Sequence, residues 1–87
     1  MKRDWELIHE ILKMIERADT LPMSIEKLAP GYFSVEKARS LPRLDLFKYN
    51  LRLLVDRGIV LVEENDKDVI LGLSWKGHDL LDKLNDD

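Results

Sequence analysis

The fold is decided by residues 41–62, which read LPRLDLFKYNLRLLVDRGIVLV. Pro42 suits the first position of a helix, because its φ angle is already helical and its missing N–H would have had no partner there. Gly58 is a typical helix stop, since glycine readily adopts the left-handed conformation that ends many helices. The sequence therefore predicts a helix over residues 42–57, followed at once by a β-branched run.

A β-hairpin and a further helix are predicted after this segment. The apolar runs 59–62 and 69–71 are rich in β-branched residues and a polar stretch separates them, so the hairpin strands are predicted over residues 59–63 and 69–73. We expect the hairpin to be buried on both faces near its base and exposed at its tip. Ser74 is a good N-cap for a helix over residues 75–85. The apolar stripe of this helix consists of Gly77, Leu80, Leu81 and Leu84.

Upstream, the first helix is predicted over residues 4–18, where apolar side chains recur on one half of the helical circumference behind an Asp4 N-cap. The following segment contains all three prolines of the chain, which forbid one long helix. Short helices can begin after Ser24 and Ser34, and the second is placed over residues 35–41. Because the next helix begins at Pro42, the two form a tight helix-turn-helix.

The predicted order of elements is that of a winged helix: a first helix, a helix-turn-helix, a two-stranded wing and a closing helix. We therefore predict an α+β fold that is mostly α, in a single winged-helix-like domain over residues 1–87. A chain of 87 residues buries roughly 60–65% of the surface of its unfolded form, so its core is thin and leaves little room for a deep cleft.

Composition excludes several classes of protein. The chain has no cysteine, so it can form neither a disulfide framework nor a thiolate metal site. No apolar run approaches the 18 or so residues of a membrane span, and no signal peptide is recognisable, so a cytoplasmic protein is expected. The net charge of −3 argues against indiscriminate binding to nucleic acid or to anionic membranes.

Three segments carry a resemblance to a known family. They are MKRDWELI at residues 1–8, YNLRLLVDRGI at 49–59 and LSWKGHDLLD at 73–82. In this order they resemble a family of small bacterial and phage proteins of unknown function, whose distinctive closing motif is Trp-x-Gly-His-Asp-x-Leu-Asp. The resemblance implies a winged-helix-like fold, an origin on prophages or other mobile elements, and no established activity. Asn50 stands where the family commonly has His, and Ser74 where it commonly has Thr.

No constellation of residues indicates catalysis. Each serine lies where a helix start or a turn favours a hydroxyl, and no Gly-x-Ser-x-Gly or glycine-rich phosphate loop is present. The two histidines, His9 and His78, fall on different helices, and two ligands do not make a zinc site. We expect a non-enzyme without cofactor or metal.

One polar cluster is predicted on the last helix, opposite its leucine stripe. It comprises Trp75, His78, Asp79 and Asp82. In one interpretation the cluster is a small acid–base or ligand site. In the favoured one, Asp79 and Asp82 pair with Lys2 and Arg3 while Trp75 covers the beginning of the first helix, which ties the two chain ends together.

Charge divides unevenly along the chain. Residues 21–58 carry seven basic and four acidic side chains, a net +3, whereas residues 59–87 carry three and eight, a net −5. The candidate DNA contacts are Arg39, Arg43, Lys48 and Arg52. The predicted wing tip opposes DNA binding, because four acidic residues there would be repelled by phosphates. These are Glu63, Glu64, Asp66 and Asp68.

The helix over residues 42–57 carries a second apolar stripe, formed by Leu46, Tyr49 and Leu53. Either this helix is covered on both sides, or the stripe is an exposed patch for a protein partner or a second copy. We favour a protein-interaction module that uses this stripe and the acidic wing tip, and that modulates a host or phage complex, including a defence system. A DNA-binding regulator that uses the same helix is the alternative.

Overall fold

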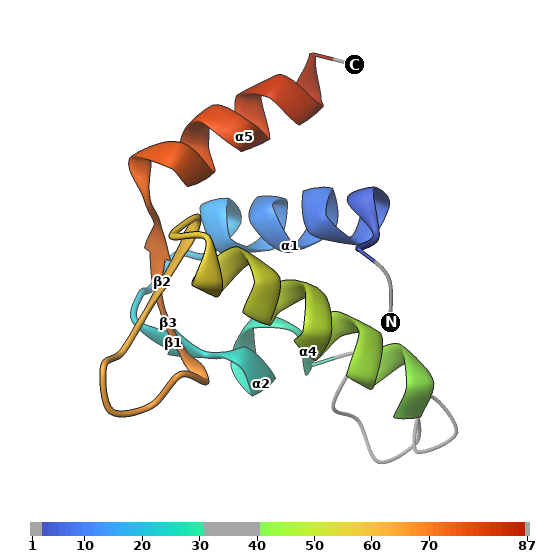
Figure 1. The fold of residues 1–87 in the computed structure, drawn as a ribbon. Coiled ribbons are helices and arrows are strands. Elements are labelled where there is room, and N and C mark those ends of the chain that lie inside the picture. The colour runs from blue at the N-terminus through green and yellow to red at the C-terminus, as the bar shows by residue number, and fades with distance from the viewer. Residues whose placement is uncertain (1–2, 31–40, 87) are drawn as a thin grey trace.

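The computed structural model describes residues 3–30 and 41–86, and within the second range it describes side chains from residue 44 onward. The elements in chain order are α1 (Trp5–Arg17), β1 (Met23–Ser24), α2 (Ile25–Leu28), α4 (Leu41–Asp56), β2 (Val60–Val62), β3 (Val69–Leu73) and α5 (Trp75–Asn85). The protein is a small, mostly helical α+β domain, as predicted (Figure 1).

The predicted helices are confirmed to within about one residue at each end. α1, α4 and α5 match the predictions over residues 4–18, 42–57 and 75–85, and α2 follows Ser24. The helix predicted over residues 35–41 lies outside the described residues, apart from Leu41, which begins α4. Periodicity and capping were sufficient to place α1 and α5, whereas the Ser24 side chain makes no capping hydrogen bond to α2.

α1 is the central element of the core. Asp4 caps it as predicted, because the Leu7 N–H donates to Asp4 Oδ1 at 3.1 Å. Figure 1 shows α1 lying between α5 and α4, and it supplies the largest share of the buried apolar side chains. The buried residues of α1 are Leu7, Ile8, Ile11, Leu12 and Ile15. Phe47 of α4, Ile70 of β3 and Leu81 of α5 close the core around them.

The described strands form an antiparallel sheet in the order β1-β3-β2. The predicted hairpin is confirmed, and β1 adds an unpredicted strand that pairs with β3. A bulge lies between β2 and β3, so that Leu71 is an extra residue next to the Leu61–Gly72 pair. The hairpin is not buried on both faces: Val60 and Ile70 point into the core, whereas Leu61 and Leu71 are 46% and 40% exposed.

A compact junction joins α4, the sheet and α5. The Ile59 N–H donates to the Leu54 carbonyl at 2.9 Å, and the Gly58 N–H donates to the Val55 carbonyl at 3.0 Å. These two bonds, with Gly58 at φ 70°, form the Schellman motif that the glycine predicted. The end of α4 thereby directs Ile59 toward α5.

The beginning of α5 is packed on the same junction. The Ser74 N–H donates to the Ile59 carbonyl at 3.0 Å, and Ser74 Oγ accepts from the Gly77 N–H at 3.1 Å. Gly77 lies so close to the Ile59 carbonyl that a side chain at this position would overlap it. A glycine is therefore required here by close approach rather than by its conformational freedom.

Candidate functional site

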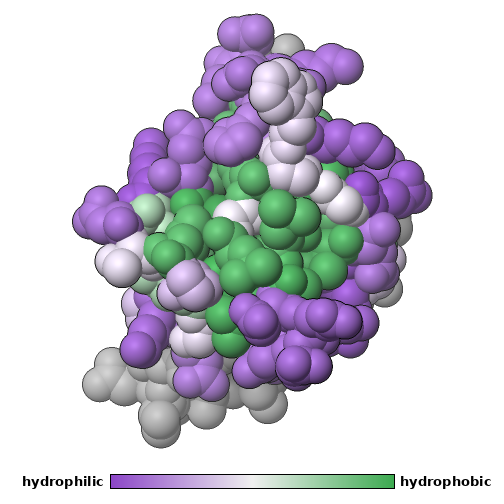
Figure 2. Space-filling model, turned by 90° about the vertical axis from the view of Figure 1, so that its left-hand side faces the viewer, coloured by the Kyte–Doolittle hydropathy of each residue, from purple (hydrophilic) through white to green (hydrophobic). Residues whose placement is uncertain are grey.

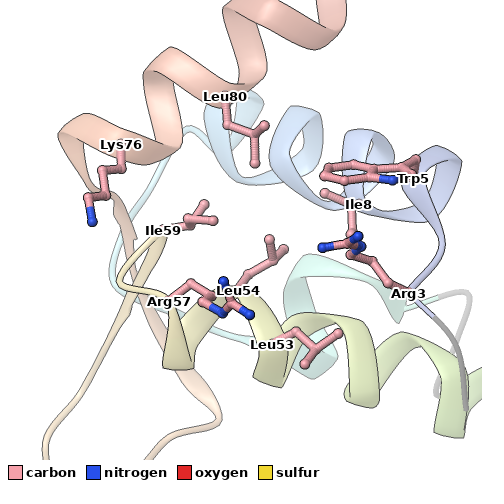
Figure 3. Close-up of a pocket in the computed structure, with 9 residues that line it drawn as sticks. All are labelled: Arg3, Trp5, Ile8, Leu53, Leu54, Arg57, Ile59, Lys76 and Leu80. Carbon is pink, nitrogen blue, oxygen red and sulfur yellow. The ribbon is translucent and has the colours of Figure 1, made fainter.

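A groove of about 350 Å³ lies between α1, α4 and α5. Its floor is apolar, and basic side chains stand around it (Figure 3). The described residues that line it are Arg3, Trp5, Ile8, Leu53, Leu54, Arg57, Ile59, Lys76 and Leu80. A volume near the lower limit of ligand pockets suits a few apolar side chains or one small molecule.

Each wall of the groove comes from a different part of the chain. α1 supplies Trp5 and Ile8, the C-terminal turn of α4 supplies Leu53 and Leu54, and α5 supplies Leu80, which points toward α1 in Figure 3. Ile59 is held between the end of α4 and the beginning of α5 by hydrogen bonds to Leu54 and Ser74. Hydrogen bonding and close packing at the junction therefore fix the relative positions of the walls.

The charge around the groove is positive. Arg3, Arg57 and Lys76 line it, and none of the described lining residues is acidic. The Arg3 guanidinium lies over the Trp5 ring, 4.7 Å from the ring centroid, which is the geometry of a cation–π contact. All three cationic side chains are exposed, so they remain available to an incoming group.

A second apolar region lies on the side of the molecule where the hairpin is found. Figure 2 shows there a broad apolar area bordered by hydrophilic side chains. The outer sheet face contributes Leu61 and Leu71, and Ile59, which lines the groove, directly precedes β2. Large exposed apolar areas with polar borders are typical of interaction surfaces.

The predicted stripe on α4 is divided between two environments. Leu46 and Leu53 are partly buried; Leu46 packs against the core, and Leu53 lines the groove. Tyr49 is 37% exposed. Neither of the two predicted alternatives describes all three residues, because the helix is covered along part of the stripe and open at Tyr49.

The predicted DNA contacts are only partly described. Lys48 and Arg52 are exposed on α4, whereas Arg39 and the Arg43 side chain lie outside the described part of the chain. Lys48 and Arg52 share a shallow depression with Lys67, Asp56 and Asp68. The acidic residues of the hairpin tip are all exposed, as predicted, and comprise Glu63, Glu64, Asp66 and Asp68.

The prediction that Trp75 covers the beginning of the first helix and so joins the two chain ends is wrong. Trp75 is 85% exposed and does not cover α1. Arg3 lies on Trp5, and Lys2 lies outside the described residues. His78, Asp79 and Asp82 are likewise exposed on α5. The leucine stripe, not the polar face, packs against α1, and His9 Nε2 hydrogen-bonds Asn85 Oδ1 at 2.6 Å.

Sequence reasoning missed the role of Asn50. It is fully buried, accepts from the Asp4 N–H at 2.9 Å through Oδ1, and donates from Nδ2 to the Leu46 carbonyl at 2.9 Å. It thereby joins α4 to the residue that caps α1. The available signal was its position on the buried stripe of α4, three residues after Phe47 and four before Leu54, where a polar side chain needs a buried partner.

The described residues contain no group of three or more His, Asp or Glu side chains arranged to hold a metal ion. None of the described helices has both the length and the apolarity that crossing a membrane requires. The candidate site is therefore the groove, which has an apolar lining and three basic side chains.

Comparison with known proteins identifies the family. A family model described as "Hypothetical protein (DUF2513)" matches residues 2–87. The chain belongs to this family. It is also similar to an "Uncharacterized protein" of Haemophilus influenzae, with 29% identity over 92 residues that cover 100% of this chain and 70% of the relative. No solved structure matches the chain significantly. The predicted membership of a family of unknown function is confirmed.

Proposed function

We propose that this DUF2513 protein is a non-catalytic binding module of winged-helix-like topology that takes up a segment of a protein partner in the groove between α1, α4 and α5. The observation that carries the proposal is the composition of the groove. Its apolar lining includes Ile8, Leu53, Leu54, Ile59 and Leu80, and the charged residues of its described lining are all basic. An apolar anchor site with a charged border is the usual anatomy of a protein interface.

The order of elements supports the winged-helix-like part of the proposal. α1, β1, α2 and α4 precede a hairpin that pairs with β1 in the order β1-β3-β2, and α5 closes the chain. In this topology the hairpin is the wing and α4 is the helix that would face a major groove. Such a fold does not decide the function, which depends on the chemistry of the surface.

The charges favour a protein over DNA. A duplex approaching α4 and the hairpin would meet Asp56 and Asp68 beside Lys48 and Arg52, and then the acidic tip. Because DNA phosphates are also negative, the carboxylates beside α4 and at the hairpin tip would weaken the phosphate contacts that supply most of the non-specific affinity for DNA.

The proposal is tested by site-specific crosslinking in cells of the source organism. A photoreactive amino acid at Leu53 should give adducts of defined mass, and one at the neighbouring exposed Arg52 should not. The partner identified at Leu53 is then purified, and the Leu80→Asp variant should bind it at least about tenfold more weakly than the wild type.

Two results would contradict the proposal. One is equal crosslinking at both positions together with equal affinity of Leu80→Asp for the partner. The other is micromolar binding of the purified protein to duplex DNA that falls steeply between 50 and 200 mM salt, since that dependence is the mark of phosphate contacts.

A further inference from the structure

We infer that the segment bound in the groove is an amphipathic α-helix whose apolar stripe is flanked by Asp or Glu side chains. This inference rests on the proposed function and specifies the chemistry of the partner. Two independent features carry it: the groove is built from side chains without a strand edge, and its described charges are all of one sign.

The secondary structure of the occupant follows from the lining. An extended peptide is usually held by main-chain hydrogen bonds to an exposed strand edge. None of the described lining residues belongs to β1, β2 or β3; eight of the nine lie in α1, α4 or α5 or flank α1 and α4, and Ile59 precedes β2. A helix satisfies its own backbone hydrogen bonds, so it can present side chains to such a groove without leaving main-chain groups unpaired.

The size of the groove limits how the helix engages it. A cavity of about 350 Å³ holds a few side chains, not the helix itself. The helix would lie across the opening and insert residues spaced three and four apart, which share one face. Trp5 and Leu80 border the opening from α1 and α5, and Leu53 lies on the α4 side (Figure 3).

The charge of the occupant follows from the surroundings. Arg3, Arg57 and Lys76 come from three separate segments and meet around the groove, although the chain as a whole carries a net −3. A local positive field on an acidic protein selects carboxylates beside the apolar anchors. Because the three side chains are exposed, we expect them to govern partner choice and association rate more than maximal affinity.

The test uses three synthetic 18-residue helical peptides with one leucine stripe and polar faces of Glu, Lys or Gln. Binding is followed by the fluorescence of Trp5 in the full-length Trp75→Phe protein, so that the exposed second tryptophan does not contribute. We expect the Glu peptide to bind about tenfold more tightly than the Lys peptide at low salt, and this preference to shrink as salt rises. Circular dichroism should show that the bound peptide is helical.

Matched variants assign the preference to the groove. Arg57→Glu with Lys76→Glu should reverse the order of the Glu and Lys peptides. Arg52→Glu with Lys83→Glu changes the same residue types outside the groove, on α4 and α5, and it should leave the order unchanged. Leu53→Asp should weaken all three peptides, and its urea transition establishes that it is folded.

The outcomes separate this inference from the proposed function. Equal binding of the Glu and Lys peptides that is lost in Leu53→Asp would overturn the acidic partner and leave the groove as a protein-binding site. Binding without helix formation would overturn the helical partner. A dimer in sedimentation that Leu53→Asp dissociates would assign the groove to a second copy. No response of Trp5 to any peptide would overturn this inference, and crosslinking at Leu53 would then decide on the proposed function.

Discussion

Replacing Gly77 by alanine sets two opposing effects against each other. Alanine in the interior of an exposed helix is favoured over glycine by about 1 kcal/mol, because glycine loses more backbone freedom on folding. Against this, a Cβ at position 77 would overlap the Ile59 carbonyl and lie 3.1 Å from the Leu73 Cβ. Relief requires α5 to move away from the junction.

The magnitude follows from what that movement disrupts. Overpacking of this kind typically costs 1–3 kcal/mol. The Ile59 carbonyl also accepts from the Ser74 N–H at 3.0 Å and from Ser74 Oγ at 3.1 Å, and each hydrogen bond contributes about 1 kcal/mol. After the gain in propensity is subtracted, we expect Gly77→Ala to lower the free energy of unfolding by about 2–4 kcal/mol.

Urea denaturation followed by circular dichroism measures this change, provided that the slope of the transition is unaltered. His78→Ala is the matched control, because His78 is exposed on the same helix and its replacement should be neutral or slightly stabilising. A Gly77→Ala protein as stable as the wild type, or more stable, would refute the idea that close approach to Ile59 fixes the position of α5.

Further substitutions test other junctions in the same urea assay. Asn50→Ala should cost about 2 kcal/mol, because it leaves the Asp4 N–H without its acceptor; an unchanged midpoint would show that water replaces the amide. Gly58→Ala should cost about 1 kcal/mol through its positive φ alone, since nothing lies within 4 Å of an added Cβ. Trp75→Ala should change stability by less than about 0.5 kcal/mol, and a larger loss would restore a packing role for this exposed ring.

Local signals predicted most of the fold. Asp4 and Ser74 accept hydrogen bonds at the helix starts where their side chains indicated N-caps, and Gly58 ends α4. These features depend on a few neighbouring residues, so the sequence alone is sufficient to recognise them. β1 was missed because a two-residue strand, Met23–Ser24, has no periodicity of its own and exists only through its pairing with β3.

The errors concern which helix face meets a neighbour. A helical wheel groups Trp75 with His78, Asp79 and Asp82 correctly, since all four are exposed on α5. It does not show that the opposite, leucine-lined face packs on α1 and leaves Trp75 in solvent. Burial is decided by tertiary packing, and a wheel describes one helix at a time.

A count of charges along the sequence has the same weakness, because it does not show which charges lie together after folding. Counted by segment, the chain from residue 59 onward is acidic, and that count favoured the acidic hairpin tip as part of the interaction surface. Lys76 belongs to this acidic segment, yet folding brings it to one groove with Arg3 and Arg57. Because exposed charges interact over about 8–10 Å in physiological salt, a ligand in the groove is influenced more by these neighbours than by the segment total. The apolar lining of the groove lies among these cations, so the partner segment that we propose is acidic rather than basic.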